Sequence, residues 1–216
     1  MAINTYALLK TEWQAWTSDS TSVLSDRFDN LTTILEARIN WGTEPPNPFP
    51  SPALRAREME NRATATADDE YLALPTDYLE LIYLKANGSP DTYLDPMTPI
   101  QATRSQWNDT SGDLKFFTVV GDEIKFFPSP SASTTVEMLY YQKIPSLVTA
   151  ANWLLTTAPN VYLFGGLLEI YLFKGAMEKA AYFHGLYSGV LNSLNQAQKM
   201  SRAGGTLIMR PDGSTP

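Results

Sequence analysis

Residues 144–174 constrain the fold most, because this segment is long, apolar and almost uncharged. Glu169 is its single acid and Lys174 its single base. Its apolar core, residues 161–173, is interrupted by two glycines and by Glu169, and it is shorter than the ~20 apolar residues that a bilayer crossing requires. We therefore expect the segment to be buried in protein.

A helix is predicted to begin at Pro159, because proline is favoured in the first helical turn. Apolar side chains lie on nearly every side of this helix, so it needs several neighbours. In one interpretation it is the central core helix of a single chain. In the other, some of its neighbours belong to further copies of the chain, and the residues predicted at this subunit interface are Tyr162, Gly165, Gly166 and Glu169.

Glu169 is a carboxylate among apolar residues, so it must find a partner or shift its pKa. We expect a hydrogen bond or an ion pair with a neighbouring helix, either in this chain or across a subunit boundary. A catalytic role for this acid is disfavoured.

The composition narrows the possible functions. The 216 residues include no cysteine, which excludes disulfides, thiolate metal sites and cysteine nucleophiles. The net charge of −7 and the scattered Lys and Arg residues argue against a protein that grips nucleic acid, because phosphate binding relies on basic clusters. The N-terminal sequence does not resemble a signal peptide, so we expect a protein made and kept in the cytosol without membrane attachment.

The apolar periodicity predicts an α+β fold, mainly an α-helical bundle with an inserted small antiparallel β-sheet or sandwich and an extended C-terminal tail. Four parts are expected. They are N-terminal helices with a Pro-rich connector over 1–66, the inserted β region over 67–145, the C-terminal helices that complete the bundle over 146–202, and an extended docking tail over 203–216.

The N-terminal part is predicted to contain three helices. Helical spacing indicates one over residues 3–16 and a second over 23–39, which stops near Gly42. The prolines of 44–52 cannot continue a helix, and a short charged helix is predicted after them over 52–64.

The middle of the chain changes from helical to alternating periodicity. Gly121-Asp122 is predicted as a tight turn between two aromatic strands, and Thr98-Pro99 as the start of a brief helix. Two further helices, over 158–174 and 177–200, are predicted to pack antiparallel through a short link near Gly175.

The expected docking tail carries one apolar triplet. Leu207, Ile208 and Met209 are followed by Arg210, and a triplet of this kind is expected to dock on a groove or sheet edge of a partner.

The sequence contains no catalytic signature of the phosphate-binding, dinucleotide, zinc-protease or serine-hydrolase kind. The single histidine, His184, has no acid–base companion nearby in sequence and is expected to be packed or interfacial. The acidic runs at Asp68–Glu70 and Asp122–Glu123 are expected in a solvated strand entry and a hairpin turn. We therefore predict a protein that is not an enzyme and that uses no cofactor or metal.

Four segments, taken in order, resemble the head-to-tail adaptor (connector) proteins of tailed bacteriophages, particularly those of short-tailed phages. They are LEARIN at 35–40, LPTDYLELIYL at 74–84, the hairpin with the following FFPSPSASTTVEMLYYQKIPSL at 126–147, and NWLLTTAPNVYLFGGLLEIYLF at 152–173. None is a catalytic motif, and the resemblance rests on the order of the four segments along the chain and on their general residue pattern.

The resemblance implies a structural virion protein. Copies would form a ring of twelve beneath the portal, extend the DNA channel and offer a platform to the tail or nozzle protein. DNA would pass without sequence-specific binding, repelled from the wall by the acidic charge. In related adaptors the C-terminal segment reaches the portal, so Leu207, Ile208, Met209 and Arg210 are the predicted portal-docking residues. The protein would reside in the neck of the virion, and in the host cytoplasm during assembly.

Two alternatives stay open. The first is another virion or host binding module that recognises protein or glycan through its β region, which predicts a stable monomer. The second is a small hydrolase using two carboxylates, which predicts a pocket holding an acid of raised pKa.

Overall fold

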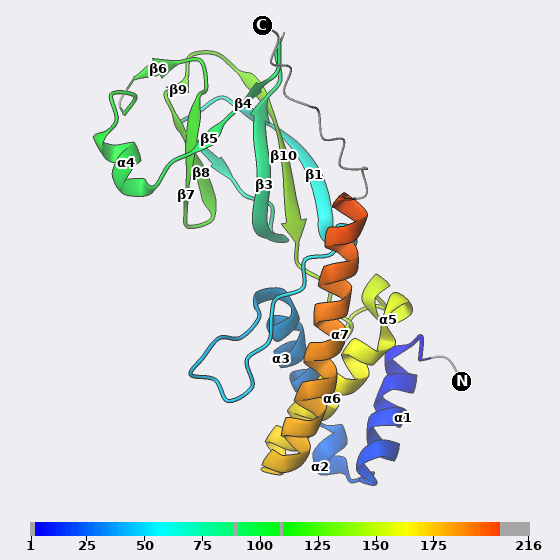
Figure 1. The fold of residues 1–216 in the computed structure, drawn as a ribbon. Helices are drawn as coiled ribbons and strands as arrows, with labels where there is room; N and C mark the ends of the chain where they lie inside the picture. Colours follow the sequence, from blue (N-terminus) through cyan, green and yellow to red (C-terminus); the bar gives the residue numbers. More distant parts are fainter. Residues whose placement is uncertain (1–2, 89, 109, 204–216) are drawn as a thin grey trace, which may run out of the picture. The chain divides into compact units, whose positions relative to one another are not determined.

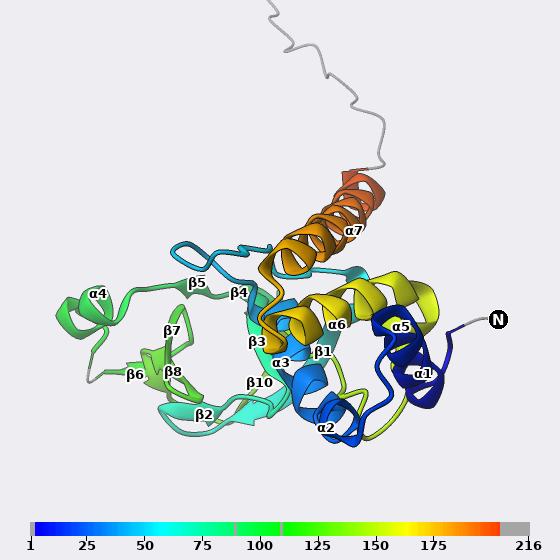
Figure 2. The same ribbon diagram turned by 90° about the horizontal axis from the view of Figure 1, so that it is seen from below.

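The computed structural model describes residues 3–88, 90–108 and 110–203, and Figures 1 and 2 show the course of the chain. The chain divides into two compact units. The helical unit combines Met1–Arg57 with Ile144–Pro216, and the β unit is Glu58–Lys143. Helices and antiparallel sheets are both present, so the predicted α+β class is confirmed.

The helical unit begins with three helices, α1 (Tyr6–Thr17), α2 (Ser22–Ser25) and α3 (Phe28–Trp41). The prediction of one continuous helix over 23–39 was wrong, because the chain breaks between α2 and α3. The Ser25 hydroxyl donates to the Ser22 carbonyl over 3.1 Å, a local bond that competes with helix continuation.

Gly42 ends α3, as predicted. Its φ of +69° is one that glycine adopts without strain, and its N–H donates to the Arg38 carbonyl over 2.8 Å. The following connector folds back on itself, since Thr43 and Ser51 pair across it as an isolated antiparallel bridge.

The prediction of a helix over 52–64 was wrong. Only Arg57–Met59 forms a short 3-10 turn, and β1 (Glu60–Ala67) follows it directly. All eight residues of β1 pair antiparallel with β10 (Thr134–Gln142), and the alternation of Ala and Thr suits a half-buried strand. Tertiary pairing therefore overrides the helical pattern read from the charged residues of this segment.

The C-terminal part supplies α5 (Trp153–Thr157), α6 (Pro159–Phe173) and α7 (Met177–Ala203). Helices beginning at Pro159 and at Met177 were both predicted, with the link at Gly175, whose φ is +71°. The helix α6 packs against α1, α3, α5 and α7, so it is the central helix of the unit. The short α5 was not predicted, although the Asn152 side chain caps it by accepting from Leu155 N over 3.0 Å.

The β unit is a small sandwich. One sheet has the strand order β1-β10-β3-β4 and the other β2-β8-β7-β5, with a separate β6-β9 pair. Buried Leu84 and Met138 from the first sheet and Phe117 and Phe126 from the second belong to one apolar core. The remaining strands are β2 (Tyr71–Ala73), β3 (Tyr78–Ala86), β4 (Thr92–Tyr93), β5 (Asp95–Pro96), β6 (Ser111–Gly112), β7 (Phe116–Val120), β8 (Glu123–Phe127) and β9 (Ser129–Pro130).

Two local predictions in the β unit are confirmed. Gly121-Asp122 turns the chain between β7 and β8, with a φ of +62° at Gly121. Thr98 caps α4 (Pro99–Arg104) in a capping box with Gln101.

Gly166→Ala is expected to destabilise the helical unit, because the added Cβ would overlap the indole of Trp13, which is fully buried and has no room to move. The expected loss is about 1–3 kcal/mol in the free energy of unfolding, measured by urea denaturation. The matched control is Gly185→Ala in α7, where a Cβ would meet nothing within 4 Å. There the helix propensity of Ala should add up to about 1 kcal/mol. Equal effects of the two substitutions would contradict this packing role.

Candidate assembly site

Glu169, one of the residues singled out on α6, forms a buried ion pair with α3. Arg38 Nε donates to Glu169 Oε1 over 2.7 Å. The two side chains are 7% and 6% exposed, so the pair is shielded from solvent. The prediction that Glu169 pairs with a neighbouring helix is confirmed, and the helix belongs to the same chain.

Arg38 also holds the connector that follows α3. Its Nη1 donates to the Phe49 carbonyl over 3.0 Å and to Thr43 Oγ1 over 3.2 Å. Burial raises the pKa of the Tyr187 phenol on α7, and the positive charge of Arg38 opposes that rise. One guanidinium thus links α3, α6 and the connector and acts electrostatically on α7.

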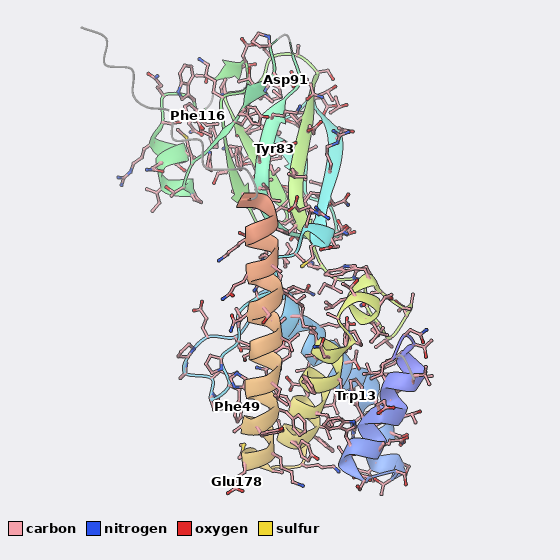
Figure 3. All side chains as sticks on the ribbon, turned by 45° about the vertical axis from the view of Figure 1, so that its right-hand side comes forward. Trp13, Phe49, Tyr83, Asp91, Phe116 and Glu178 are labelled. Carbon is pink, nitrogen blue, oxygen red and sulfur yellow. The ribbon has the colours of Figure 1, made fainter. Side chains whose placement is uncertain are left out.

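Gly165 and Gly166 allow α6 to approach its neighbours closely. A Cβ on Gly165 would lie 2.5 Å from Leu35 Cδ1 and 3.0 Å from Tyr187 Cε2. A Cβ on Gly166 would overlap the Trp13 indole, whose Nε1 donates to the Leu163 carbonyl over 3.2 Å. Figure 3 shows Trp13 on α1, beside α6. The two glycines therefore admit α3, α7 and α1 to the surface of α6.

Tyr162 belongs to a buried polar cluster. Its hydroxyl accepts from Asn152 Nδ2 over 2.6 Å and donates to Glu36 Oε1 over 3.5 Å. Glu36 Oε1 also accepts from Leu147 N over 2.6 Å. Burial raises the pKa of the Glu36 carboxyl, and the bond from Leu147 partly offsets this rise. Burial likewise raises the pKa of the Tyr162 phenol.

All four predicted interface residues have their neighbours within this chain. Tyr162, Gly165, Gly166 and Glu169 are buried in the helical unit, which agrees with the core interpretation of the helix. A subunit interface at these positions stays a prediction, and their burial means that a second copy would meet other side chains first. Sequence reasoning missed Arg38 as the partner of Glu169, although Arg38 lies within the LEARIN segment.

The predicted docking residues Leu207, Ile208, Met209 and Arg210 lie outside the described residues. His184 is packed as expected. Its Nε2 lies 2.7 Å from the Pro50 carbonyl and 3.0 Å from Ser188 Oγ, and its ring contacts Phe49.

Large apolar side chains that remain exposed on the helical unit are a second feature that sequence reasoning missed. Ile34 belongs to the apolar repeat that predicted a helix over 23–39, but it is exposed on α3. The exposed set is Trp16, Val23, Ile34, Trp41, Val148, Phe173, Met177 and Tyr182. Exposed apolar side chains that cluster mark contact surfaces.

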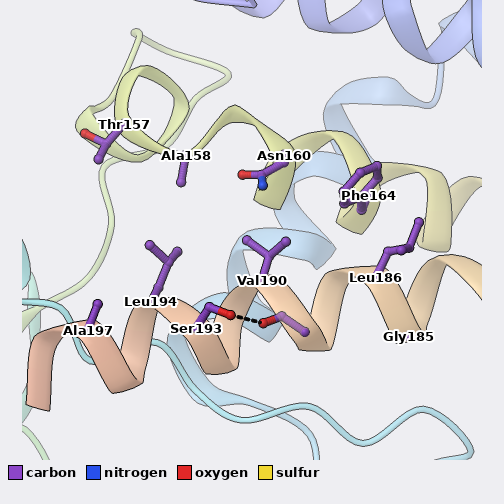
Figure 4. A pocket seen from close by; sticks show the side chains of 11 residues that line it. Thr157, Ala158, Asn160, Phe164, Gly185, Leu186, Val190, Ser193, Leu194 and Ala197 are labelled. Atoms are coloured by element: carbon purple, nitrogen blue, oxygen red, sulfur yellow. Dashed lines mark hydrogen bonds between the residues drawn. The ribbon is translucent and has the colours of Figure 1, made fainter. Parts of the chain in front are cut away.

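A groove of about 710 Å³ lies between α6 and α7 (Figure 4). Phe164 faces it from α6, and Leu186, Val190 and Leu194 face it from α7. The remaining lining residues are Thr157, Ala158, Asn160, Gly185, Gly189, Ser193 and Ala197. None of these lining residues is charged.

The described residues bear on the other functional alternatives as well. Within 3–88, 90–108 and 110–203, no three His, Asp or Glu side chains are grouped to hold a metal ion. Glu36 is an acid of raised pKa, as a hydrolase would need, but it is 6% exposed and enclosed by Leu147 and Tyr162, so a substrate cannot reach it. No helix in the described part of the chain is long and apolar enough to span a membrane.

The polar groups at the centre of the helical unit bind helices to one another. Residues 4–210 match the family of the SU10 adaptor protein, so the chain belongs to that family. It is a phage head-to-tail adaptor protein, and the resemblance to this family read from its four sequence segments is confirmed, while the assignment to short-tailed phages stays a prediction. No curated protein matches the chain.

Glu169→Gln should destabilise the helical unit by about 3–5 kcal/mol, because it leaves the buried guanidinium of Arg38 without a counter-charge. The double substitution Arg38→Met with Glu169→Leu removes both charges and should recover most of this loss. Urea denaturation of the parent, Glu169→Gln, the single variants Arg38→Met and Glu169→Leu, and the double variant measures the effect. A double variant as unstable as the sum of its single substitutions would show that the two residues do not act as a pair.

Glu36→Gln should change how stability depends on pH. The raised pKa means that the folded chain binds this proton more tightly than the unfolded chain. The contribution of Glu36 is therefore fully present below its ordinary pKa of 4.5 and is lost as the pH rises through the folded pKa. Urea denaturation between pH 4 and pH 8 should show the variant gaining stability relative to the parent as the pH rises. A constant difference would contradict the buried, destabilised carboxylate.

Proposed function

We propose that this adaptor forms a ring between the portal and the tail of a short-tailed phage and that the ring lines the DNA channel. The match to the SU10 adaptor family over residues 4–210 is the observation that supports the proposal most strongly. In this proposal the partners are further copies of the chain, in a ring of twelve, together with the portal protein and the tail or nozzle protein. The protein acts in the virion neck and is assembled in the host cytoplasm.

The charge of the chain suits a channel through which DNA slides. Each copy carries a net charge of −7, and a ring multiplies this charge around the axis. Phosphates and acidic side chains repel each other, so DNA would pass without sequence-specific binding.

The portal contact is assigned to Leu207, Ile208, Met209 and Arg210, which follow α7 in the sequence. An apolar triplet next to a cation suits a groove with an acidic rim on the partner. The role is structural rather than catalytic, and no cofactor is needed. The alternative, recognition of a protein or glycan through the β unit, has no specific observation in its favour.

Purified chain mixed with portal rings from the same virus should give a second ring on the portal, visible by negative-stain electron microscopy. Serine at Leu207, Ile208 and Met209 should weaken attachment while leaving the far-ultraviolet circular dichroism unchanged, because the triplet contacts the partner rather than the core. Alanine at Ser214 and Thr215 is the control within the same tail.

If portal rings never bind this chain, the proposal of an adaptor ring is contradicted. If the serine variant loses its helical signal, the triplet belongs to the fold of the monomer instead. If the serine variant attaches as well as the parent, another segment of the chain must make the portal contact.

A further inference from the structure

We propose that the outward stripe of α3 in one copy packs into the groove between α6 and α7 of the next copy. The stripe is Asn30, Ile34, Ala37 and Trp41. The inference rests on the proposed ring and names the two surfaces that would join its subunits.

The groove offers the surface of a helix partner. Leu186, Val190 and Leu194 recur along α7 at a spacing of four residues, which places them on one side of the helix. Opposite them, Phe164 borders the groove from α6 (Figure 4). A volume of about 710 Å³ is room for several side chains rather than for a single water or ion.

Two glycines deepen this groove. Gly185 and Gly189 are exposed on α7, and a Cβ built at either position would meet no atom within 4 Å. They differ from Gly165 and Gly166, where the chain's own side chains fill the space that a Cβ would take. Gly185 and Gly189 expose the backbone of α7, and small residues of this kind allow a second helix to approach closely.

Within the described part of the helical unit, the stripe on α3 is a helix face exposed to solvent. Leu31, Leu35 and Ile39 are buried on the opposite side of α3, which packs on α6. The stripe residues recur at steps of four, three and four, the spacing of a helix–helix seam. Ile34 is 51% exposed and Trp41 61% exposed, so the seam presents two large apolar side chains to solvent.

The stripe and the groove agree in length. At 1.5 Å per residue, the stripe from Asn30 to Trp41 extends over about 17 Å. The groove along α7 from Gly185 to Ala197 extends over about 18 Å. A helix seam of three turns therefore fits the groove from end to end.

Charge favours a second copy as the occupant. Copies that each carry a net charge of −7 repel one another, and this repulsion opposes a contact least where charged side chains are absent from both surfaces. The stripe residues and the groove-lining residues are all uncharged.

The two surfaces lie on different sides of one compact unit, because the stripe faces away from α6 while the groove is bordered by α6. A contact between stripe and groove is therefore heterologous, since each copy offers both halves. Such a contact repeats from copy to copy and closes into a ring when the rotation between copies allows.

Because the chain has no cysteine, introduced cysteines can report the contact without background. Ala37→Cys places a thiol on the stripe, and Gly189→Cys places one in the groove. With a short bismaleimide, the double variant at high protein concentration should give a ladder of covalent oligomers on denaturing gels. Each single variant alone should stay monomeric.

A mixture of the two single variants is the decisive sample. One chain has its thiol only on the stripe and the other only in the groove, so cross-linking should stop at the dimer. The control is a double variant that carries Ala7→Cys, at another exposed alanine on α1, in place of Ala37→Cys, and it should give no ladder. Circular dichroism of every variant verifies that it folds.

Four outcomes would overturn the proposal. They are a dimer from a single variant alone, no ladder from the folded double variant, a ladder from the control double variant, and slower labelling of Gly189→Cys in the full chain than in a chain that ends at Ala203. The last result would assign the groove to residues 204–216 of the same chain. Portal attachment without the ladder would support the adaptor function and contradict only this interface. A ladder without portal attachment would support the interface and contradict the adaptor function.

Discussion

The helical unit depends on one buried charge pair. A buried ion pair contributes little net stability, because removing two charges from water costs about as much as their attraction returns. Its effect is on specificity, since any other register of α3 against α6 would leave Arg38 or Glu169 buried without a partner. The same guanidinium binds the Phe49 carbonyl, so the register of two helices and the course of the connector are set together.

Close packing around α6 follows from this arrangement. Gly165 and Gly166 bring α3, α7 and α1 against α6, and the polar cluster of Tyr162, Asn152 and Glu36 secures the segment that leads into α5 and α6. The most apolar helix of the chain is thus enclosed by its own neighbours. Large apolar side chains face solvent on the outer side of α3, and bare backbone does so on α7, which are the surfaces that we propose for assembly.

Much of this architecture could be read from the sequence, and the exceptions have physical causes. Pro159, Gly42 and Gly121 act locally, through φ angles and missing donors, so the elements they bound were predicted. The strand β1 was missed because its conformation is imposed by pairing with β10, more than 60 residues away in the chain. Glu169 indicated that a partner must exist, but only tertiary packing identifies Arg38. Ile34 fits the apolar repeat, and its exposure depends on which helices lie beside α3.

The two segments of the helical unit that flank the inserted β unit are both bonded to one residue, Asn40. Arg55 Nη1 donates to the Asn40 carbonyl just before the insertion begins, and Ile144 N donates to Asn40 Oδ1 just after it ends. The end of α3 therefore fixes the segment before the insertion and the segment after it, whatever sequence lies between them. An insertion held in this way can be lengthened, replaced or deleted while the helical unit keeps its own packing.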